Sequence, residues 1–109
     1  MLIQENLILN RADPSGLGGT QFLYKVNDYG VTAVSRPQEN ISNIHWEVDI
    51  IKYLETRPLR FEVCHTTEMA SKTLKFYSDH SLNEFLKKAF SYFKELSLLE
   101  NMLPDKNES

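Results

Sequence analysis

The clearest pattern of apolar and polar positions lies near the C-terminus, in residues 81–97, SLNEFLKKAFSYFKELS. At about 100° per residue, its apolar side chains fall on one half of a helical wheel and its charged side chains on the other. Ser81 and Glu84 have the spacing of a capping box, which satisfies backbone N–H groups at the start of a helix. The pattern predicts an amphipathic helix whose apolar stripe packs on a core, an interpretation that we favour over a ligand site. The stripe consists of Leu82, Phe85, Leu86, Ala89, Phe90, Tyr92, Phe93 and Leu96.

The amphipathic pattern fails after residue 97, because Glu100 falls in the middle of the apolar half of the wheel. The helix therefore either ends near residue 97 or continues past the edge of the core, with Leu98 and Met102 pointing away from it. Leftover apolar side chains suggest a partner or dimer contact, and an end that folds back is the alternative. The partner-binding candidates are Leu98, Leu99, Met102 and Leu103.

Alternating apolar and polar residues predict strands in the rest of the chain. The expected strands are residues 20–26, 31–36, 44–54, 59–64 and 73–77. Residues 27–30 and 55–58 have the composition of turns, residues 10–19 (NRADPSGLGG) that of a loop, and residues 1–9 fit either a first strand or a docking arm. Short connections favour antiparallel pairing. The expected fold class is α+β, an antiparallel meander of about five strands with one C-terminal amphipathic helix on one face.

Each expected strand has an inward face by the same alternation. One face is shared by Phe22, Tyr24 and Val26, and in the longest strand by Ile44, Trp46, Val48, Ile50 and Leu54; the residues expected inward in the last two strands are Leu59, Phe61 and Val63, then Leu74 and Phe76.

Length and composition fit a small globular protein. The 109 residues suffice for one domain, which we place at residues 1–103, with a disordered polar tail at 104–109 that begins with the helix-stopping Pro104. A net charge of −3 disfavours a non-specific nucleic-acid binder. The single cysteine excludes an intrachain disulfide. No apolar run approaches a membrane span, and residues 1–5 do not have the pattern of a signal peptide, so we expect a cytoplasmic protein.

The sharpest candidates for chemistry are the metal-ligand types His45, Glu47, Asp49 and Cys64. The first three alternate along one expected strand and share its outward face, about 7 Å apart. If Leu54 pairs with Leu59, Asp49 lies beside Cys64, and a zinc-like His/Asp/Cys cluster becomes conceivable. A solvated polar face is the favoured interpretation, so we expect no metal and no cofactor.

Other patterns are weaker still. Adjacent Cys64 and His65 point to opposite faces of a strand, so they do not form a nucleophile–base pair, and we expect no catalytic residue and no enzyme. The glycine-rich loop runs into a strand, whereas a phosphate cradle runs into a helix. A basic strip could bind single-stranded nucleic acid, but the acidic residues among its members favour an ordinary surface. The strip is Lys52, Arg57, Arg60, Lys72 and Lys75, near Tyr53 and Tyr77.

One stretch resembles a class of small phage and prophage proteins of unknown function. The matching residues are Gly19-Thr20-Gln21-Phe22, then Tyr24-x-Val26-Asn27-x-Tyr29-Gly30-Val31-x-Ala33-Val34, then Trp46-Glu47-Val48-x-Ile50. The match covers residues 19–50 and departs where Ala33 replaces the usual serine and where this C-terminal helix is longer. The resemblance implies a shared fold and a gene on a mobile element, and it implies no catalytic residue.

The sequence thus predicts a small non-enzymatic, phage- or prophage-encoded protein that binds another protein. The expected partner is a protein, either part of a host complex or a second copy of the chain, with no membrane and no nucleic acid. An inhibitor of a host nucleic-acid-processing or defence complex, using acidic residues as a partial mimic, is the first alternative. A small metal-dependent enzyme that uses His45, Glu47 or Asp49 and Cys64 is the second.

Overall fold

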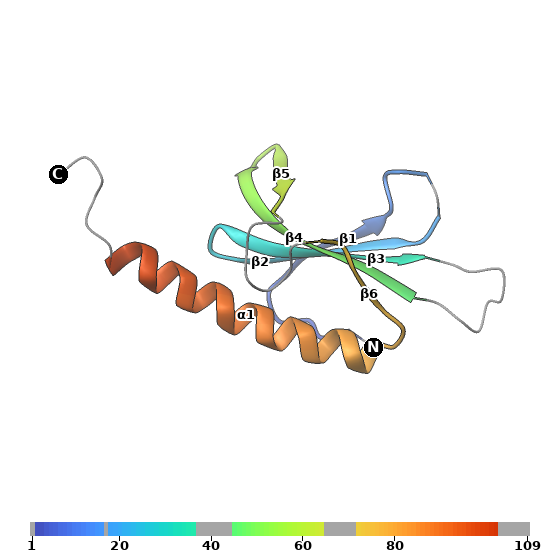
Figure 1. Ribbon diagram of the computed structural model, residues 1–109. Coiled ribbons are helices and arrows are strands. Elements are labelled where there is room, and N and C mark those ends of the chain that lie inside the picture. Colours follow the sequence, from blue (N-terminus) through green and yellow to red (C-terminus); the bar gives the residue numbers. More distant parts are fainter. Residues whose placement is uncertain (1, 17, 37–44, 65–71, 103–109) are drawn as a thin grey trace.

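The computed structural model describes residues 2–16, 18–36, 45–64 and 72–102, and it places one long helix against one face of an antiparallel sheet (Figure 1). The elements are β1 (Leu7–Ala12), β2 (Thr20–Val26), β3 (Tyr29–Arg36), β4 (His45–Thr56), β5 (Leu59–Val63), β6 (Leu74–Phe76) and α1 (Asp79–Met102). The expected α+β fold is confirmed. Within these ranges, no helix has the length and apolar character needed to cross a bilayer.

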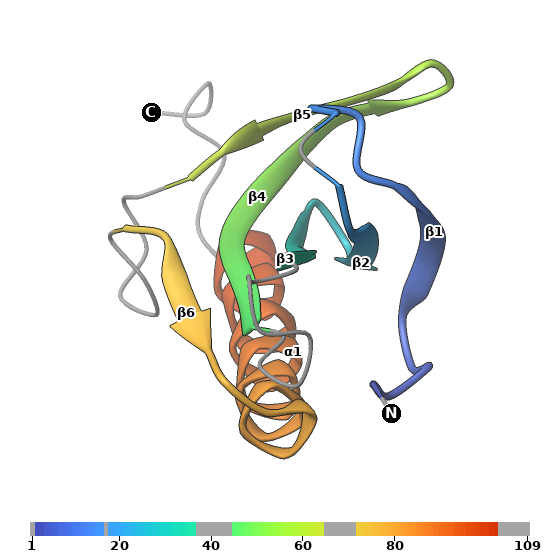
Figure 2. The same cartoon turned by 90° about the vertical axis from the view of Figure 1, so that its right-hand side faces the viewer.

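The long strand β4 organises the sheet. The strand order is β1-β2-β3-β4-β5, and β6 also pairs with β4. Along the edge of β4 that does not pair with β3, Trp46 pairs with Phe76 of β6, and farther along Ile51 pairs with Val63 of β5. Figure 2 shows β6 beside α1, whereas β5 lies at the upper end of β4, away from the helix. β4 therefore pairs with both short strands, and the sheet carries an apolar cluster on each face.

The two hairpins follow the expected turn positions, although β3 starts two residues earlier and β4 ends two residues later than predicted. β2 matches its expected range, and β3 begins at Tyr29 directly after a turn made by Asn27 and Asp28. Asn27 has a φ of 57°, a left-handed conformation that asparagine tolerates better than most residues. In the second hairpin Thr56 pairs with Leu59, so only two residues form the loop.

The first strand, β1, extends into residues that were predicted to form a loop. The composition of residues 10–19 predicted a loop from Asn10 onward, but Asn10 pairs with Phe22, and β1 continues to Ala12. This prediction was wrong because polar residues are compatible with an edge strand. The turn starts only at Asp13, whose backbone N–H donates to the carbonyl of Gly19 at 3.1 Å.

The helix starts one turn before the expected cap. The backbone N–H of Ser81 donates to the Oγ of Ser78 at 3.0 Å, so Ser78 is the cap and the predicted Ser81 capping box is wrong. Asp79, in the first turn, accepts a hydrogen bond from the Nε1 of Trp46 at 2.8 Å. This contact fixes the start of α1 to β4, which no local sequence pattern could indicate.

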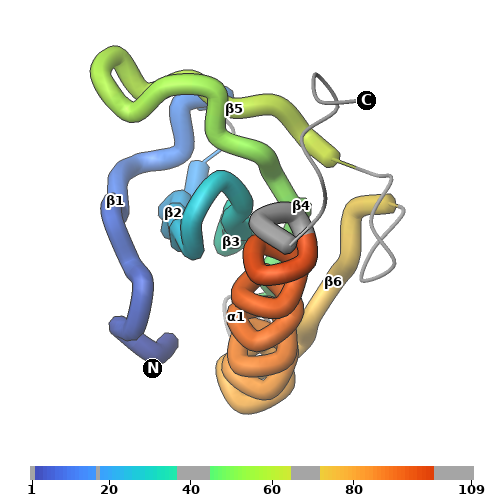
Figure 3. The backbone as a smooth tube through the Cα atoms, turned by 90° about the vertical axis from the view of Figure 1, so that its left-hand side faces the viewer, coloured from blue at the N-terminus to red at the C-terminus, as the bar shows by residue number. Residues whose placement is uncertain are grey.

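The apolar stripe of α1 is buried as predicted. Figure 3 shows α1 running below the sheet, between the N-terminal segment and β6. Phe90 lies against Tyr24, with ring centroids 5.5 Å apart, and Phe93 stacks on Tyr29 at 5.8 Å. Leu82, Leu86, Ala89, Phe90 and Phe93 are buried, and Phe85, Tyr92 and Leu96 are half-buried against the same core.

A second apolar cluster covers part of the opposite face of the sheet. It consists of buried Leu23, Ile51 and Tyr53, with half-buried Leu9, Leu59 and Phe61. Sequence alternation placed Leu59, Phe61, Val63 and Leu54 on the helix side, and this was wrong. A register irregularity beside Leu54 shifts the pairing, so that Phe61 opposes Tyr53. A one-residue shift moves side chains to the other face; Leu54 is 50 % exposed and Val63 49 %.

Two buried tyrosines join the clusters to the backbone. The hydroxyl of Tyr53 donates to the carbonyl of Tyr24 at 2.8 Å, and burial raises the pKa of Tyr53. The hydroxyl of Tyr24 donates to the carbonyl of Ile3 at 2.8 Å, and burial, with a contribution from Asp79, raises the pKa of Tyr24 to about 12. The ring of Tyr53 lies across Gly30, where an added Cβ would be 2.5 Å from Cε2 of that ring. Glycine is therefore required at this position.

We expect Phe93→Ala to lower the free energy of unfolding by about 3–5 kcal/mol, because it empties a fully buried aromatic position. Urea titration of the wild type and the variant measures the difference. Ser91→Ala, on the exposed side of the same helix, is the matched control and should change stability by less than about 0.5 kcal/mol. A loss below about 1 kcal/mol for the Phe93 variant would contradict the packing of α1.

Candidate functional site

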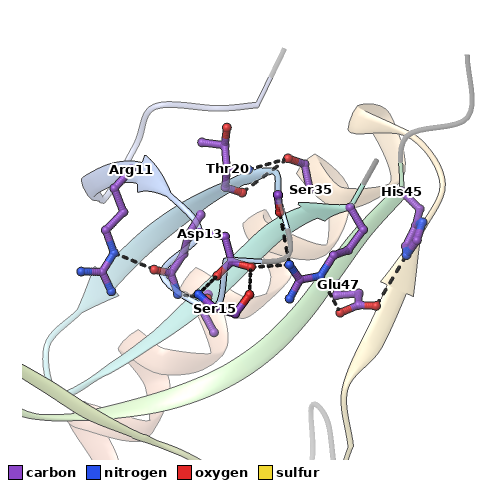
Figure 4. Close-up of polar contacts among 11 residues, drawn as sticks. Arg11, Asp13, Ser15, Thr20, Ser35, His45 and Glu47 are labelled. Carbon is purple, nitrogen blue, oxygen red and sulfur yellow. Dashed lines mark hydrogen bonds and ion pairs between the residues drawn. The ribbon is translucent and has the colours of Figure 1, made fainter. Parts of the chain in front are cut away.

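Four charged or titratable side chains form a network at one end of the sheet face opposite α1 (Figure 4). Arg36, at the end of β3, forms a hydrogen-bonded ion pair with Asp13 through Nη1, and its Nε lies 3.3 Å from the Oε2 of Glu47. The Nε2 of His45 lies 3.6 Å from the other oxygen of Glu47. We call Asp13, Arg36, Glu47 and His45 the Arg36 network.

The network holds the glycine-rich loop against the sheet. The Oδ1 of Asp13 accepts from the backbone N–H of Ser15 at 3.3 Å, and its Oδ2 accepts from the Ser15 hydroxyl at 2.6 Å. Arg36 also donates to the carbonyl of Gly18 at 3.3 Å. Gly19 has a φ of 94°, and an added Cβ would lie 1.8 Å from the carbonyl oxygen of Ser35. Gly19 thus allows a close approach of the loop to β3, and the loop leads into a strand.

Both carboxylates of the network pair with Arg36. The Asp13 side chain is only 5 % exposed, and the hydrogen bond from the Ser15 hydroxyl, together with Arg36, holds the pKa of Asp13 below its usual value. Asp13 and Glu47 in turn raise the pKa of Arg36. An arginine between two carboxylates is already neutralised, so an anion would have to displace them to bind. The arrangement therefore favours a structural role, as a clamp between the loop, β3 and β4.

The predicted metal ligands do not come together. His45 and Glu47 are in contact, but Asp49 accepts a hydrogen bond at 2.6 Å from the hydroxyl of Thr73. Cys64 donates its backbone N–H to the carbonyl of Ile50 at 2.8 Å and packs against the core on the helix side.

The conceivable His/Asp/Cys cluster is therefore not formed, because the actual register pairs Thr56 with Leu59 rather than Leu54 with Leu59. Among the residues that the structure describes, no group of three or more His, Cys, Asp or Glu side chains could hold a metal ion.

A polar row crosses the same face beside the Arg36 network. The Nε of Arg11 donates to the Oε1 of Gln21 at 2.8 Å, and the Nε2 of Gln21 donates to the Thr32 hydroxyl at 3.1 Å. Gln21 and Thr32 are buried. Sequence reasoning included neither this row nor Arg36 and Asp13 among its candidates. The Asp-Pro pair marked a turn, but only the strand register brings Asp13 to Arg36.

The predicted basic strip is divided between two places. Lys75 is opposite Glu47 near the start of β4, whereas Arg60 contacts Glu55 at 3.3 Å near its end. Tyr53 is buried, which removes it as a stacking surface for a base, while Tyr77 is 72 % exposed. Lys52 lies over the ring of Tyr29, with Nζ 5.8 Å from the centroid. Lys72 and Arg57 are exposed.

The end of α1 carries the remaining apolar surface. The helix runs on to Met102, past the turn between β2 and β3 (Figure 1), so of the two alternatives that the sequence left open, the structure has the helix that continues beyond the core. Leu98 is 62 % exposed and Leu99 59 %. Leu103 and the expected tail at 104–109 lie outside the described residues.

Comparison with known proteins gives no match to a family model, a curated protein or a solved structure. The resemblance to phage and prophage proteins therefore stays a prediction. The geometry of the site offers a network of paired charges on one face and an exposed apolar helix end on the other.

We expect Asp13→Asn to reduce the free energy of unfolding at neutral pH. The variant should also lose less of its stability than the wild type when the pH is lowered. A carboxyl whose pKa is lower in the folded state than its usual 3.8 stabilises the fold above that value. This contribution is lost as the pH falls through the folded pKa. Urea titrations at neutral pH and below about pH 3 measure both effects.

Asp28→Asn, at an exposed carboxylate in the turn between β2 and β3, is the matched control. It should change stability little at either pH. Equal acid sensitivity in the Asp13 variant and the wild type would show that the Arg36 network does not stabilise the loop.

Proposed function

We propose that this chain is a small non-enzymatic protein that binds another protein through the projecting end of α1. The observation that carries the proposal is the exposure of two adjacent leucines, Leu98 and Leu99, at 62 % and 59 %. Adjacent helical positions differ by about 100°, so together these side chains give the helix end an apolar surface over more than a quarter of its circumference. We name Leu98 and Leu99 the α1 tip.

The projection follows from the burial along α1. The stripe is buried or half-buried as far as Leu96, whereas Leu98 and Leu99 are exposed on a helix that continues to Met102. The end of the helix lies past the turn between β2 and β3 (Figure 1). Single exposed leucines are ordinary, but two on one projecting helical turn form a compact apolar contact. An apolar helix end fits a groove on a protein partner.

The charge distribution supports binding over chemistry. Asp13 and Glu47 share Arg36, and in the described part of the chain the exposed carboxylates of Glu55 and Glu84 contact Arg60 and Lys87. A surface of mixed sign favours a protein-binding role over a partial mimic of nucleic acid. The further proposal that the gene belongs to a phage or prophage rests on the resemblance of residues 19–50.

The proposal predicts that Leu98→Glu with Leu99→Glu abolishes partner binding while the fold is kept. Tagged protein is purified from a bacterial lysate with nuclease treatment, and the bound proteins are compared by mass spectrometry. We expect binding to be lost because two charges replace the apolar contact, and charged groups are costly to bury without partners.

Ser91→Glu with Thr56→Glu adds the same charge at two exposed positions away from the α1 tip and is the matched control. A specific partner retained by the control and lost by the leucine variant supports the proposal. A partner that both variants retain would place the binding surface elsewhere, and the absence of any partner would contradict the proposed function.

A further inference from the structure

The segment before β1 connects the sheet to the helix. Residues 2–4, which we name the strap, lie beside the first turns of α1 (Figures 2 and 3). The backbone N–H of Ile3 donates to the Oδ1 of Asn83 on α1 at 2.9 Å, and the carbonyl of Ile3 accepts from the hydroxyl of Tyr24 on β2 at 2.8 Å. Leu2 is 4 % exposed and is part of the main core. The strap is thus bound by an apolar contact and by two hydrogen bonds to its main chain.

A tight turn joins the strap to β1. The backbone N–H of Leu7 donates to the carbonyl of Gln4 at 3.1 Å, and Asn6 has a φ of 65°. A positive φ at the third residue of such a turn favours glycine or asparagine. The Nδ2 of Asn6 is buried without a hydrogen-bond partner among the described residues. Opening of the turn would relieve both costs, because the amide would become hydrated and the backbone could leave the left-handed region.

The rest of the structure is held together without the strap. Residues 2–4 belong to no strand, and pairing of β1 with β2 begins at Leu7. The start of α1 is fixed separately to β4 by the hydrogen bond from Trp46 to Asp79. Release of the strap would therefore leave the helix attached and the sheet paired. Segments with few such contacts are the ones that open locally while the rest of a protein stays folded.

We propose that the strap is a displaceable occupant of a peptide-binding site between α1 and β2, and that it opens about the turn at residues 4–7. The site consists of the apolar position filled by Leu2, the acceptor Oδ1 of Asn83 and the hydroxyl donor of Tyr24. An apolar position with a few fixed polar groups is the usual composition of a binding site. These groups select a short peptide with an aliphatic residue directly before the residue whose main chain is bound. The strap is the segment that the structure shows in place.

This site is independent of the proposed binding by the α1 tip. The strap contacts α1 at Asn83, in the first turns of the helix, whereas Leu98 and Leu99 lie near its other end. Either surface can therefore act without the other, and the variants that test one leave the other unchanged.

Amide hydrogen exchange of the full-length wild type tests the opening. The N–H groups of Ile3 and Leu7, whose hydrogen bonds belong to the strap and its turn, should exchange at least about a hundredfold faster than the slowest amides of β3 and β4. Equal protection of the two sets would overturn the proposal, because the strap would then open only when the whole domain unfolds.

Binding of a labelled peptide of residues 1–6, MLIQEN, tests the site. The Leu2→Asp variant of the full chain loses the apolar contact of its own strap, so its site should be open. Fluorescence anisotropy should show that this variant binds the peptide at least about tenfold more tightly than the wild type, in which the strap competes. A peptide that itself carries Leu2→Asp should not bind.

Leu54→Asp makes the same change at an exposed leucine of β4 and is the matched control, which should bind the peptide as weakly as the wild type. Equal binding by all three proteins, or binding by none, would overturn the proposal. Circular dichroism checks the fold of the Leu2→Asp variant. An unfolded variant would also overturn the proposal, because the strap would then be needed for the rest of the chain to fold.

Discussion

Burial of the aromatic stripe of α1 against β2, β3 and β4 forms the main core and holds the helix on the sheet. Each fully buried side chain of the stripe stabilises the fold by about 1.5–3 kcal/mol, and Leu82, Leu86 and Phe93 are completely buried. Two further contacts fix this packing at its start: the cap by Ser78 and the hydrogen bond from Trp46 to Asp79. Because the stripe ends at Leu96, the last turns of the helix extend beyond the surface that buries the rest of it.

The second face of the sheet is stabilised differently. Its apolar cluster around Ile51 and Tyr53 occupies one end, and the polar row and the Arg36 network occupy the other. The four residues of this network are half-buried, and its two carboxylates pair with Arg36. Here the pairing holds a loop close to β3, and this accounts for the positive φ at Gly19. The network thus has a structural role in holding the loop, while the uncovered end of α1 is the surface proposed to contact another protein.

The sequence predicts the features whose causes are local. Helical periodicity gives the stripe of α1, and alternation gives β2, β3, β4 and their turns. Features that depend on register were not predictable. A single irregular position, Leu54, decides which face Phe61 occupies and separates Cys64 from Asp49. The cap was ambiguous for a related reason, because Ser78 and Ser81 are both good caps and the contact of Asp79 with Trp46 selects the earlier start. The candidate site shows the same division: exposure of Leu98 followed from the periodicity, whereas the Arg36 network joins residues that only tertiary structure brings together.

In this structure α1 is covered along its stripe and uncovered at its tip. Residue-resolved amide hydrogen exchange of the isolated chain distinguishes the two parts of the helix, because protection reports local opening. We expect amides from Leu86 to Phe93 to exchange only with global unfolding, whereas those around Leu98 and Leu99 should exchange much faster although they are helical. Uniform protection along the whole of α1 would contradict this arrangement, because it would mean that the last turns are already covered.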